Sequence, residues 1–158
     1  MKLVIAEKPS VALELAKVIG ATKRCNGYYI GNNYLVSWCI GHLVTLFNCE
    51  DYDPAWKQWK KETLPIIPEI FKLKPVKTTK EQFYILKKLM NSDDITSIIE
   101  ATDAGREGEL IFRHVYKLVG CKKPIQRLWI NSYTDKDIYE GFQNLQLGVN
   151  FEGLYECA

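Results

Sequence analysis

The segment EATDAGREGEL, residues 100–110, gathers acidic side chains around one arginine and two glycines directly after an apolar run. Its acids after the run are Asp103, Glu107 and Glu109. Carboxylates held close together repel one another unless a proton or a cation joins them, and Mg²⁺ prefers oxygen ligands of this kind. The alternative is a solvated helix start, because acids in a first turn oppose the helix dipole favourably. Taken alone, the segment favours the helix start.

A second acid shifts that balance toward a functional site. Glu7 follows KLVIA (2–6), an apolar run with β-branched residues that is typical of a buried strand, and Asp103 follows a similar run, ITSIIEA (95–101). Parallel strands present their carboxyl ends at one edge of a sheet, where ligands bind and helix N-termini point. Glu107 lies four residues beyond Asp103, in the first turn of the next predicted helix. We therefore expect the three carboxylates to converge and to bind Mg²⁺ together with a phosphate.

Basic residues and glycines beside these acids fit the same hypothesis. Lys8 and Arg106 are expected to bind a phosphate oxygen, Arg106 through two hydrogen bonds. Gly105 and Gly108 are expected to let a bulky phosphate approach the backbone closely. Neither G-x-x-x-x-G-K nor G-x-G-x-x-G occurs, which argues against the common nucleotide-binding turns.

Strand and helix patterns alternate along the chain. Predicted strands cover 2–6, 95–101 and 125–130, and predicted helices cover 11–20, 79–91, 108–120 and 134–145. The first helix has Pro9 in its first turn with Ser10 helping to cap it, Gly20 and Gly120 end two helices, and Thr134 caps the last. Residues 27–43 read as a hairpin turning at GNN. We predict an α/β fold with a mostly parallel central sheet and helices on both faces, plus this hairpin and a long irregular insertion.

The insertion covers residues 48–68, which contain three prolines, and a lysine-rich stretch overlaps it. Residues 57–88 hold nine lysines against three glutamates, interleaved with Trp56, Trp59, Phe71 and Phe83. Such a stretch could face a polyanion, or it could be a solvated lysine surface. Charge alone favours the solvated surface.

Composition places the chain among ordinary globular proteins. Its 158 residues are 47% apolar and 25% charged with a net charge of +2, which argues against disorder and fits one domain. Five cysteines without a CxxC pair suggest neither a disulfide framework nor a zinc ribbon, and they fit a reducing cytoplasm. The start is no signal peptide, and no run reaches the roughly 20 apolar residues that span a bilayer. The abrupt ending NFEGLYECA suggests a piece of a longer protein.

Three motifs carry a family resemblance: IAEKPS near the start, WCIGHL in the hairpin and ATDAGREGELI. Together with LPIIPE in the insertion, they resemble the Toprim domain of type IA DNA topoisomerases, closest to the bacterial topoisomerase III branch. The resemblance implies an α/β fold with four parallel strands and helices on both faces. It also implies that residues 1–146 form the Toprim domain and that residues 147–158 begin the next segment of a longer enzyme.

The resemblance implies catalytic and DNA-binding roles residue by residue. Glu7 matches the glutamate that handles the proton of the leaving 3′ oxygen. Lys8 matches a lysine near the scissile phosphate, and Arg106 matches the arginine embedded in the acidic motif. Both are expected to act in catalysis and to contact DNA. His42, in GHL, is expected to contact DNA as well, although a packed histidine at a strand end is an equal alternative.

The metal ligands implied by the resemblance are Asp103 and Glu107, with Glu7 beside them, and the implied ion is Mg²⁺. Gly105 stands where the family pattern DxDxE has its second aspartate. This departure favours one metal ion over two.

The implied activity is that of an ATP-independent isomerase that cuts and rejoins one DNA strand through a covalent tyrosine link. None of the nine tyrosines lies in a matching context, so we expect the nucleophile in another domain and this fragment alone to be inactive. The expected partner is single-stranded DNA, with no membrane, no small-molecule cofactor and a monomeric isolated domain. Alternatives are a Toprim nuclease or primase, a non-catalytic nucleic-acid-binding module built on the lysine-rich stretch, and an inert scaffold.

Overall fold

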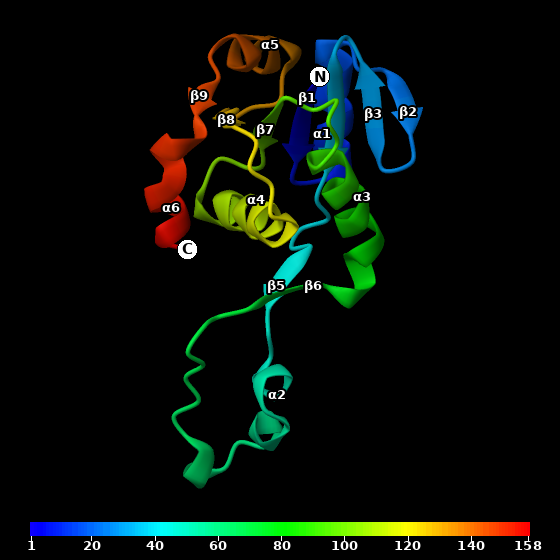
Figure 1. Ribbon diagram of the computed structural model, residues 1–158. Coiled ribbons are helices and arrows are strands. Elements are labelled where there is room, and N and C mark those ends of the chain that lie inside the picture. Colours follow the sequence, from blue (N-terminus) through cyan, green and yellow to red (C-terminus); the bar gives the residue numbers. More distant parts are fainter.

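A seven-stranded sheet forms the centre of the computed structural model, which describes residues 1–158 (Figure 1). The strand order is β2-β3-β4-β1-β7-β8-β9. The parallel strands are β4 (Tyr34–Trp38), β1 (Lys2–Ala6), β7 (Ser97–Ala101) and β8 (Ile125–Arg127). The antiparallel strands at the margins are β2 (Lys23–Cys25), β3 (Tyr28–Gly31) and β9 (Gln146–Leu147). The predicted α/β fold with parallel central strands is confirmed.

Strand β1 is apolar throughout its buried length because it has a neighbour on each side and a core on each face. Leu3 and Ile5 face one hydrophobic core, and Val4 and Ala6 face the other. Alternate side chains of a strand point to opposite faces, so only a strand covered on both faces reads as a continuous apolar run.

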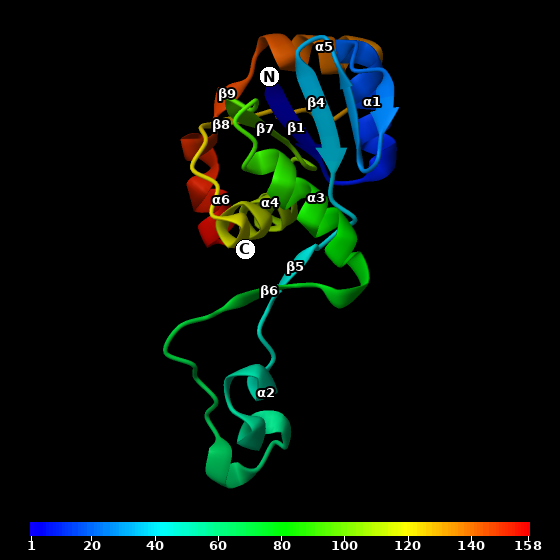
Figure 2. The same ribbon diagram turned by 45° about the vertical axis from the view of Figure 1, so that its right-hand side comes forward.

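Helices cover both faces of the sheet, as predicted (Figures 1 and 2). Helices α1 (Pro9–Ile19) and α5 (Asp135–Gln143) pack on one core, and α3 (Lys80–Met90) and α4 (Arg106–Val119) pack on the other. The short α6 (Glu152–Glu156) packs against α4 at the margin. Each helix is either too short or too polar to span a bilayer.

Most of the predicted helix boundaries are confirmed, and one cap is wrong. Gly20 and Gly120 end α1 and α4 in the left-handed conformation, and the Thr134 hydroxyl accepts from the Asp137 amide at 3.2 Å. Ser10 does not cap α1, because the helix begins at Pro9 and Ser10 already lies inside its first turn. The N-cap position belongs to Lys8, whose side chain makes no capping bond.

Two further boundaries differ from the prediction. Strand β8 ends at Arg127 instead of residue 130, because its partner β7 ends at Ala101 and leaves the following residues without a neighbouring strand. Helix α4 begins at Arg106, two residues earlier than predicted, so Arg106 and Glu107 both lie in its first turn.

The predicted hairpin joins the sheet, and the predicted insertion leaves it. Asn32 and Asn33 turn the chain between β3 and β4 with φ of 47° and 64°, values that asparagine tolerates. Past β4, β5 (Val44–Leu46) and β6 (Leu73–Pro75) form a separate two-stranded ribbon. Residues 47–72 between them, called the arm below, extend away from the body (Figures 1 and 2). The short helical segments are α2 (Cys49–Tyr52) and the 3₁₀ turns Pro54–Lys57, Lys61–Thr63, Lys77–Thr79 and Gly148–Phe151.

Candidate active site

Glu7 and Asp103 meet at the carboxyl edge of the sheet. They follow β1 and β7, which are parallel neighbours in the register Ala6↔Ala101. Oε2 of Glu7 accepts a hydrogen bond from the Asp103 amide at 3.1 Å. Lys8, also at the end of β1, brings its Nζ to 3.4 Å from Oδ2 of Asp103. The structure therefore brings together two of the three acids and one of the two bases that the sequence analysis placed at this edge.

Glu107 lies in the first turn of α4 and pairs with His42 instead of with the other two acids. Oε1 of Glu107 is 2.5 Å from Nε2 of His42, which follows β4, the other parallel neighbour of β1. The side chain of Glu107 is 70% exposed and that of His42 is 40% exposed. His42 is thus not a packed core histidine, and it faces the same strand edge as Glu7.

Arg106 is the first residue of α4, where helix amides and the helix dipole favour anions. Its Nη1 donates to the Cys157 carbonyl at 3.4 Å, so the guanidinium lies beside the C-terminal helix α6. An open depression of about 410 Å³ adjoins it, lined by Gly105, Arg106, Glu107, Cys157 and Ala158. A phosphate could reach both the guanidinium and the helix N-terminus from this depression.

The acids do not form a complete metal-binding site made of protein side chains alone. No group of three or more Asp, Glu, His or Cys side chains is gathered closely enough to hold a metal ion. The carboxylate of Asp103 is nevertheless half-exposed and that of Glu107 is exposed, and both lie on one edge. Mg²⁺ is typically held by one or two carboxylates, with waters and substrate phosphate completing its coordination. The donors present fit that mode of binding, in which the ion would compete with Lys8 for Asp103 and with His42 for Glu107.

Arg127, which the sequence analysis missed, fixes the backbone of the Asp103 loop. Its side chain is fully buried and donates to the carbonyls of Thr102 at 2.8 Å and Asp103 at 2.9 Å. It also bonds Oε1 of the buried Glu109 at 2.7 Å. Burial raises the pKa of neighbouring Glu100 well above its usual value, although Arg127 acts in the opposite direction. The available signal was an arginine inside a predicted core strand, because a buried guanidinium needs partners.

Tyr133 is a second residue that the sequence analysis missed. Its hydroxyl donates to Oδ1 of Asp103 at 3.0 Å. Burial, and then the contact with the Asp103 carboxylate, raise the pKa of Tyr133, so it stays a hydrogen-bond donor at neutral pH. Asp103 is therefore held by Lys8 on one oxygen and by Tyr133 on the other. No sequence signal separated Tyr133 from the other tyrosines.

The expectation that both glycines make room for phosphate is wrong at Gly108. A Cβ added there would lie 2.1 Å from the carbonyl oxygen of Asp103, so the loop backbone already fills the space. Gly108 allows α4 to pack against the Asp103 loop. A Cβ added at Gly105 would meet nothing within 4 Å, so that side of the loop is open.

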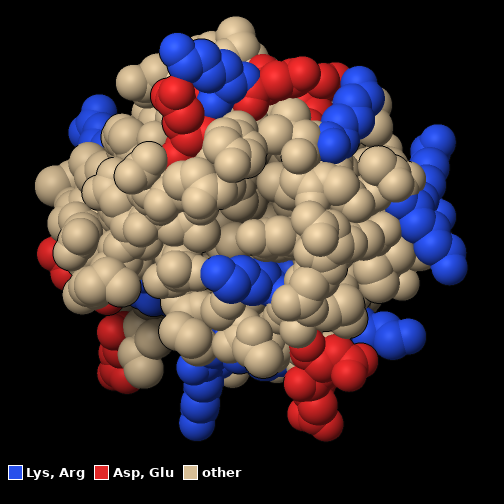
Figure 3. Space-filling view, turned by 90° about the horizontal axis from the view of Figure 1, so that it is seen from above, with Lys and Arg blue, Asp and Glu red and all other residues tan.

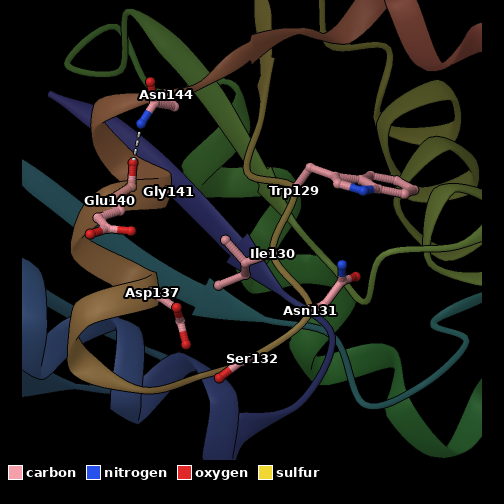
Figure 4. A pocket seen from close by; sticks show the side chains of 8 residues that line it. All are labelled: Trp129, Ile130, Asn131, Ser132, Asp137, Glu140, Gly141 and Asn144. Atoms are coloured by element: carbon pink, nitrogen blue, oxygen red, sulfur yellow. Dashed lines mark hydrogen bonds between the residues drawn. The ribbon is translucent and has the colours of Figure 1, made fainter.

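Another cavity, of about 390 Å³, lies apart from these residues, between the segment after β8 and α5 (Figure 4). Asp137 and Glu140 line it, and the Asn144 side-chain amide donates to the Glu140 carbonyl at its border at 2.8 Å. None of the residues predicted for the site lines this cavity. The chemistry-bearing side chains belong instead to the ends of the parallel strands.

Comparisons with known proteins identify the family of the chain. The family model of the Toprim domain matches residues 2–133. The chain is 46% identical over 157 residues to a DNA topoisomerase 3 from Shouchella clausii and 49% identical over 156 residues to one from Bacillus subtilis. Each match covers 99% of this chain but 22% of the relative, so the chain spans about a fifth of these relatives.

A solved structure shares the fold. It is the full-length topoisomerase I from Thermotoga maritima, which matches with a TM-score of 0.58 and 19% identity. The match covers 92% of this chain and 21% of that protein. Since the family model spans most of the chain, including both strand ends with their acids, the chain belongs to the Toprim domain family.

Proposed function

We propose that this chain is the Toprim domain of a type IA DNA topoisomerase of the topoisomerase 3 kind. The whole enzyme would cut and rejoin one DNA strand without ATP, using a tyrosine from another part of a longer polypeptide. The identity to DNA topoisomerase 3 over 99% of the chain supports the assignment. The observation that carries it is the contact of Glu7 with Asp103, with Lys8 beside them, at the ends of two adjacent parallel strands.

The reaction needs one proton to move at the sheet edge. The tyrosine hydroxyl loses its proton to water as its oxygen forms a bond to phosphorus, and the bond from phosphorus to the 3′ oxygen breaks while Glu7 donates a proton to that leaving oxygen. During rejoining Glu7 takes the proton back. Because the Asp103 amide holds Oε2 of Glu7, the carboxyl group has a fixed direction and its other oxygen is left for proton exchange. Lys8 and Arg106 stabilise the charge that develops on the phosphate.

Metal dependence is general among Toprim domains of topoisomerases, and we propose Mg²⁺ as the ion here. Asp103 and Glu107 would hold it, with Glu7 nearby, and the bound ion would neutralise phosphate charge. The absence of a carboxylate at Gly105 favours a single ion. His42, released from Glu107, would contact the DNA backbone.

Several remaining assignments belong to the same proposal. The partner is a single-stranded stretch of DNA, and neither a small-molecule cofactor nor a membrane takes part. The isolated domain is a monomer in the cytoplasm, where a reducing environment suits the buried thiols of Cys39 and Cys121. The Toprim domain covers residues 1–146, and residues 147–158 begin the next segment. That segment packs back on the domain, with Phe151 stacked on Trp129 at 4.9 Å between ring centroids.

The test is Glu7→Gln in the full-length enzyme, assayed by relaxation of negatively supercoiled plasmid. We expect a loss of about 10²–10⁴-fold in rate, the range typical of a lost general acid, with DNA binding nearly unchanged. Glu14→Gln is the matched control, because Glu14 is a half-exposed acid of α1 that pairs only with Lys17. Full activity of the Glu7 variant would refute the assignment. Mg²⁺-dependent nicking by the 158-residue chain alone would identify a nuclease instead.

A further inference from the structure

The arm has a defined shape but no core of its own. No residue from 45 to 81 is buried, whereas buried residues occur throughout the rest of the chain. Local contacts nevertheless order it: the Lys72 amide donates to the Tyr52 hydroxyl at 2.7 Å, and the Tyr52 ring lies 5.4 Å from that of Phe47. Segments below about 40 residues rarely bury enough apolar surface to hold a fold alone. The arm therefore needs a partner surface to be stable in this shape.

Large apolar side chains of the arm are exposed to solvent. The exposed fractions are 79% for Trp59, 71% for Ile67, 69% for Ile70, 66% for Phe71 and 52% for Leu64. Scattered single apolar residues are normal on a surface, but this many within one short segment mark an interaction site. Aromatic and aliphatic anchors of this kind occupy the centre of protein–protein interfaces.

The charge of the arm does not fit a polyanion. Residues 47–72 contain four lysines and five acids, so the net charge of the arm is −1. The other five lysines of the lysine-rich stretch lie beyond it, on β6, the following 3₁₀ turn and α3. Positive and negative side chains are also interspersed on the opposite end of the molecule (Figure 3). Single-strand binding combines a basic groove with stacking aromatics, and isoleucines such as Ile67 and Ile70 cannot stack on bases. A protein partner fits better.

The position of the arm limits which protein surface it can reach. It leaves the body after β4, at the same sheet edge where Glu7 and Asp103 meet, and the C-terminus lies on that side of the body (Figures 1 and 2). The matches to the relatives cover 99% of this chain, so they include the arm, and they leave most of each relative outside the matched region.

We propose that the arm docks, through Trp59, Ile67 and Ile70, on another domain of the same longer polypeptide, and so holds that domain at the Glu7–Asp103 edge. The proposal rests on the proposed function only in requiring the longer polypeptide. The docked domain covers the arm's apolar residues, and the contact supplies the core that the arm lacks.

Hydrogen–deuterium exchange of residues 47–72 tests the docking in the 158-residue chain and in the full-length protein. We expect exchange in the arm to slow at least about tenfold in the full-length protein, because docking closes the local opening that permits exchange. The double variant Trp59→Ser with Ile67→Ser should return the full-length arm to the fast rate. It should leave the melting temperature of the 158-residue chain unchanged. Tyr139→Ser, at a 61% exposed position on α5, is the matched control and should change neither rate.

Three results would overturn the proposal. One is equal arm exchange in the two proteins. Another is protection in the 158-residue chain that rises with its concentration, which would identify a second copy as the partner. The third is protection of that chain by a 30-nucleotide oligo-dT, which would identify single-stranded DNA. The exchange measurement does not depend on whether Glu7→Gln abolishes relaxation, so the docking proposal and the proposed function can be refuted independently.

Discussion

Replacing Arg127 by methionine removes the buried cation that holds the Asp103 loop. The guanidinium is fully buried and contacts Glu109, Thr102 and Asp103 at 2.7–2.9 Å. Methionine fills much of the volume but donates nothing, so two loop carbonyls lose their donor and Glu109 loses its nearest cation. The variant should therefore be destabilised through unpaired buried groups and not through a cavity.

The magnitude follows from what stays paired. Removing one partner of a buried ion pair costs about 3–5 kcal/mol. Glu109 keeps Arg113, whose Nε lies 3.4 Å from its Oε2, so we expect the lower end, about 3 kcal/mol. Proteins of this size lose roughly 2–4 °C in melting temperature per kcal/mol, which predicts a fall of about 6–12 °C.

Thermal and urea unfolding, followed by circular dichroism, measure the effect. Arg24→Met is the control, because Arg24 is exposed on the marginal strand β2 and should change stability by less than about 0.5 kcal/mol. Adding Glu109→Gln to Arg127→Met removes the unpaired charge and should recover part of the loss. A single variant within 1 kcal/mol of the wild type, or a double variant less stable than the single one, would show that Arg127 does not stabilise the fold through these buried pairs.

Two further predictions concern the same loop. Gly108→Ala should destabilise the fold by about 1–3 kcal/mol in urea unfolding, because its Cβ would lie 2.1 Å from the Asp103 carbonyl oxygen. Gly105→Ala should be tolerated, and equal effects of the two variants would contradict the packing role of Gly108. Burial raises the pKa of Glu100, so the folded protein keeps a proton that the unfolded chain releases. The stability linked to this proton is fully present below the pKa of Glu100 in the unfolded chain. It is lost as the pH rises toward the raised pKa of Glu100 in the folded protein. The stability of Glu100→Gln relative to the wild type should therefore increase as the pH is raised from 4 to 8 in unfolding measurements. A difference in stability between the two proteins that stays constant with pH would rule out this linkage.

Local patterns were sufficient for most of the elements. The apolar run 2–6 is a strand with Glu7 at its end, and the faces formed by Phe83, Leu86, Leu89 and Met90 lie in the core as the helical spacing predicts. The glycine stops and the Thr134 cap follow from conformational preferences that act within one turn of chain. The prediction that Ser10 caps α1 was wrong because a serine cap must precede the first helical residue, which is the position that proline favours. Ser10 follows Pro9, and the helix begins at Pro9, so Lys8 takes the N-cap position.

The lysine-rich stretch shows where reading along the chain fails. Residues 57–88 are continuous in sequence, but the structure divides them between the arm and α3, which face different surroundings. Net charge over a sequence window therefore did not describe any one surface.

Residue types along the chain are enough to show that acids end two apolar strands, because an apolar run bounded by charge is recognisable locally and parallel strands share a carboxyl edge. The hydrogen-bond partners of those acids depend on how distant segments pack in three dimensions. Glu7 accepts a hydrogen bond from the Asp103 amide, and Glu107 pairs with His42. Arg127 and Tyr133 donate hydrogen bonds to Asp103. Hydrogen bonds depend on distances of a fraction of an ångström between residues far apart in the chain, and those distances are set by how strands and helices pack. No spacing within one segment encodes them.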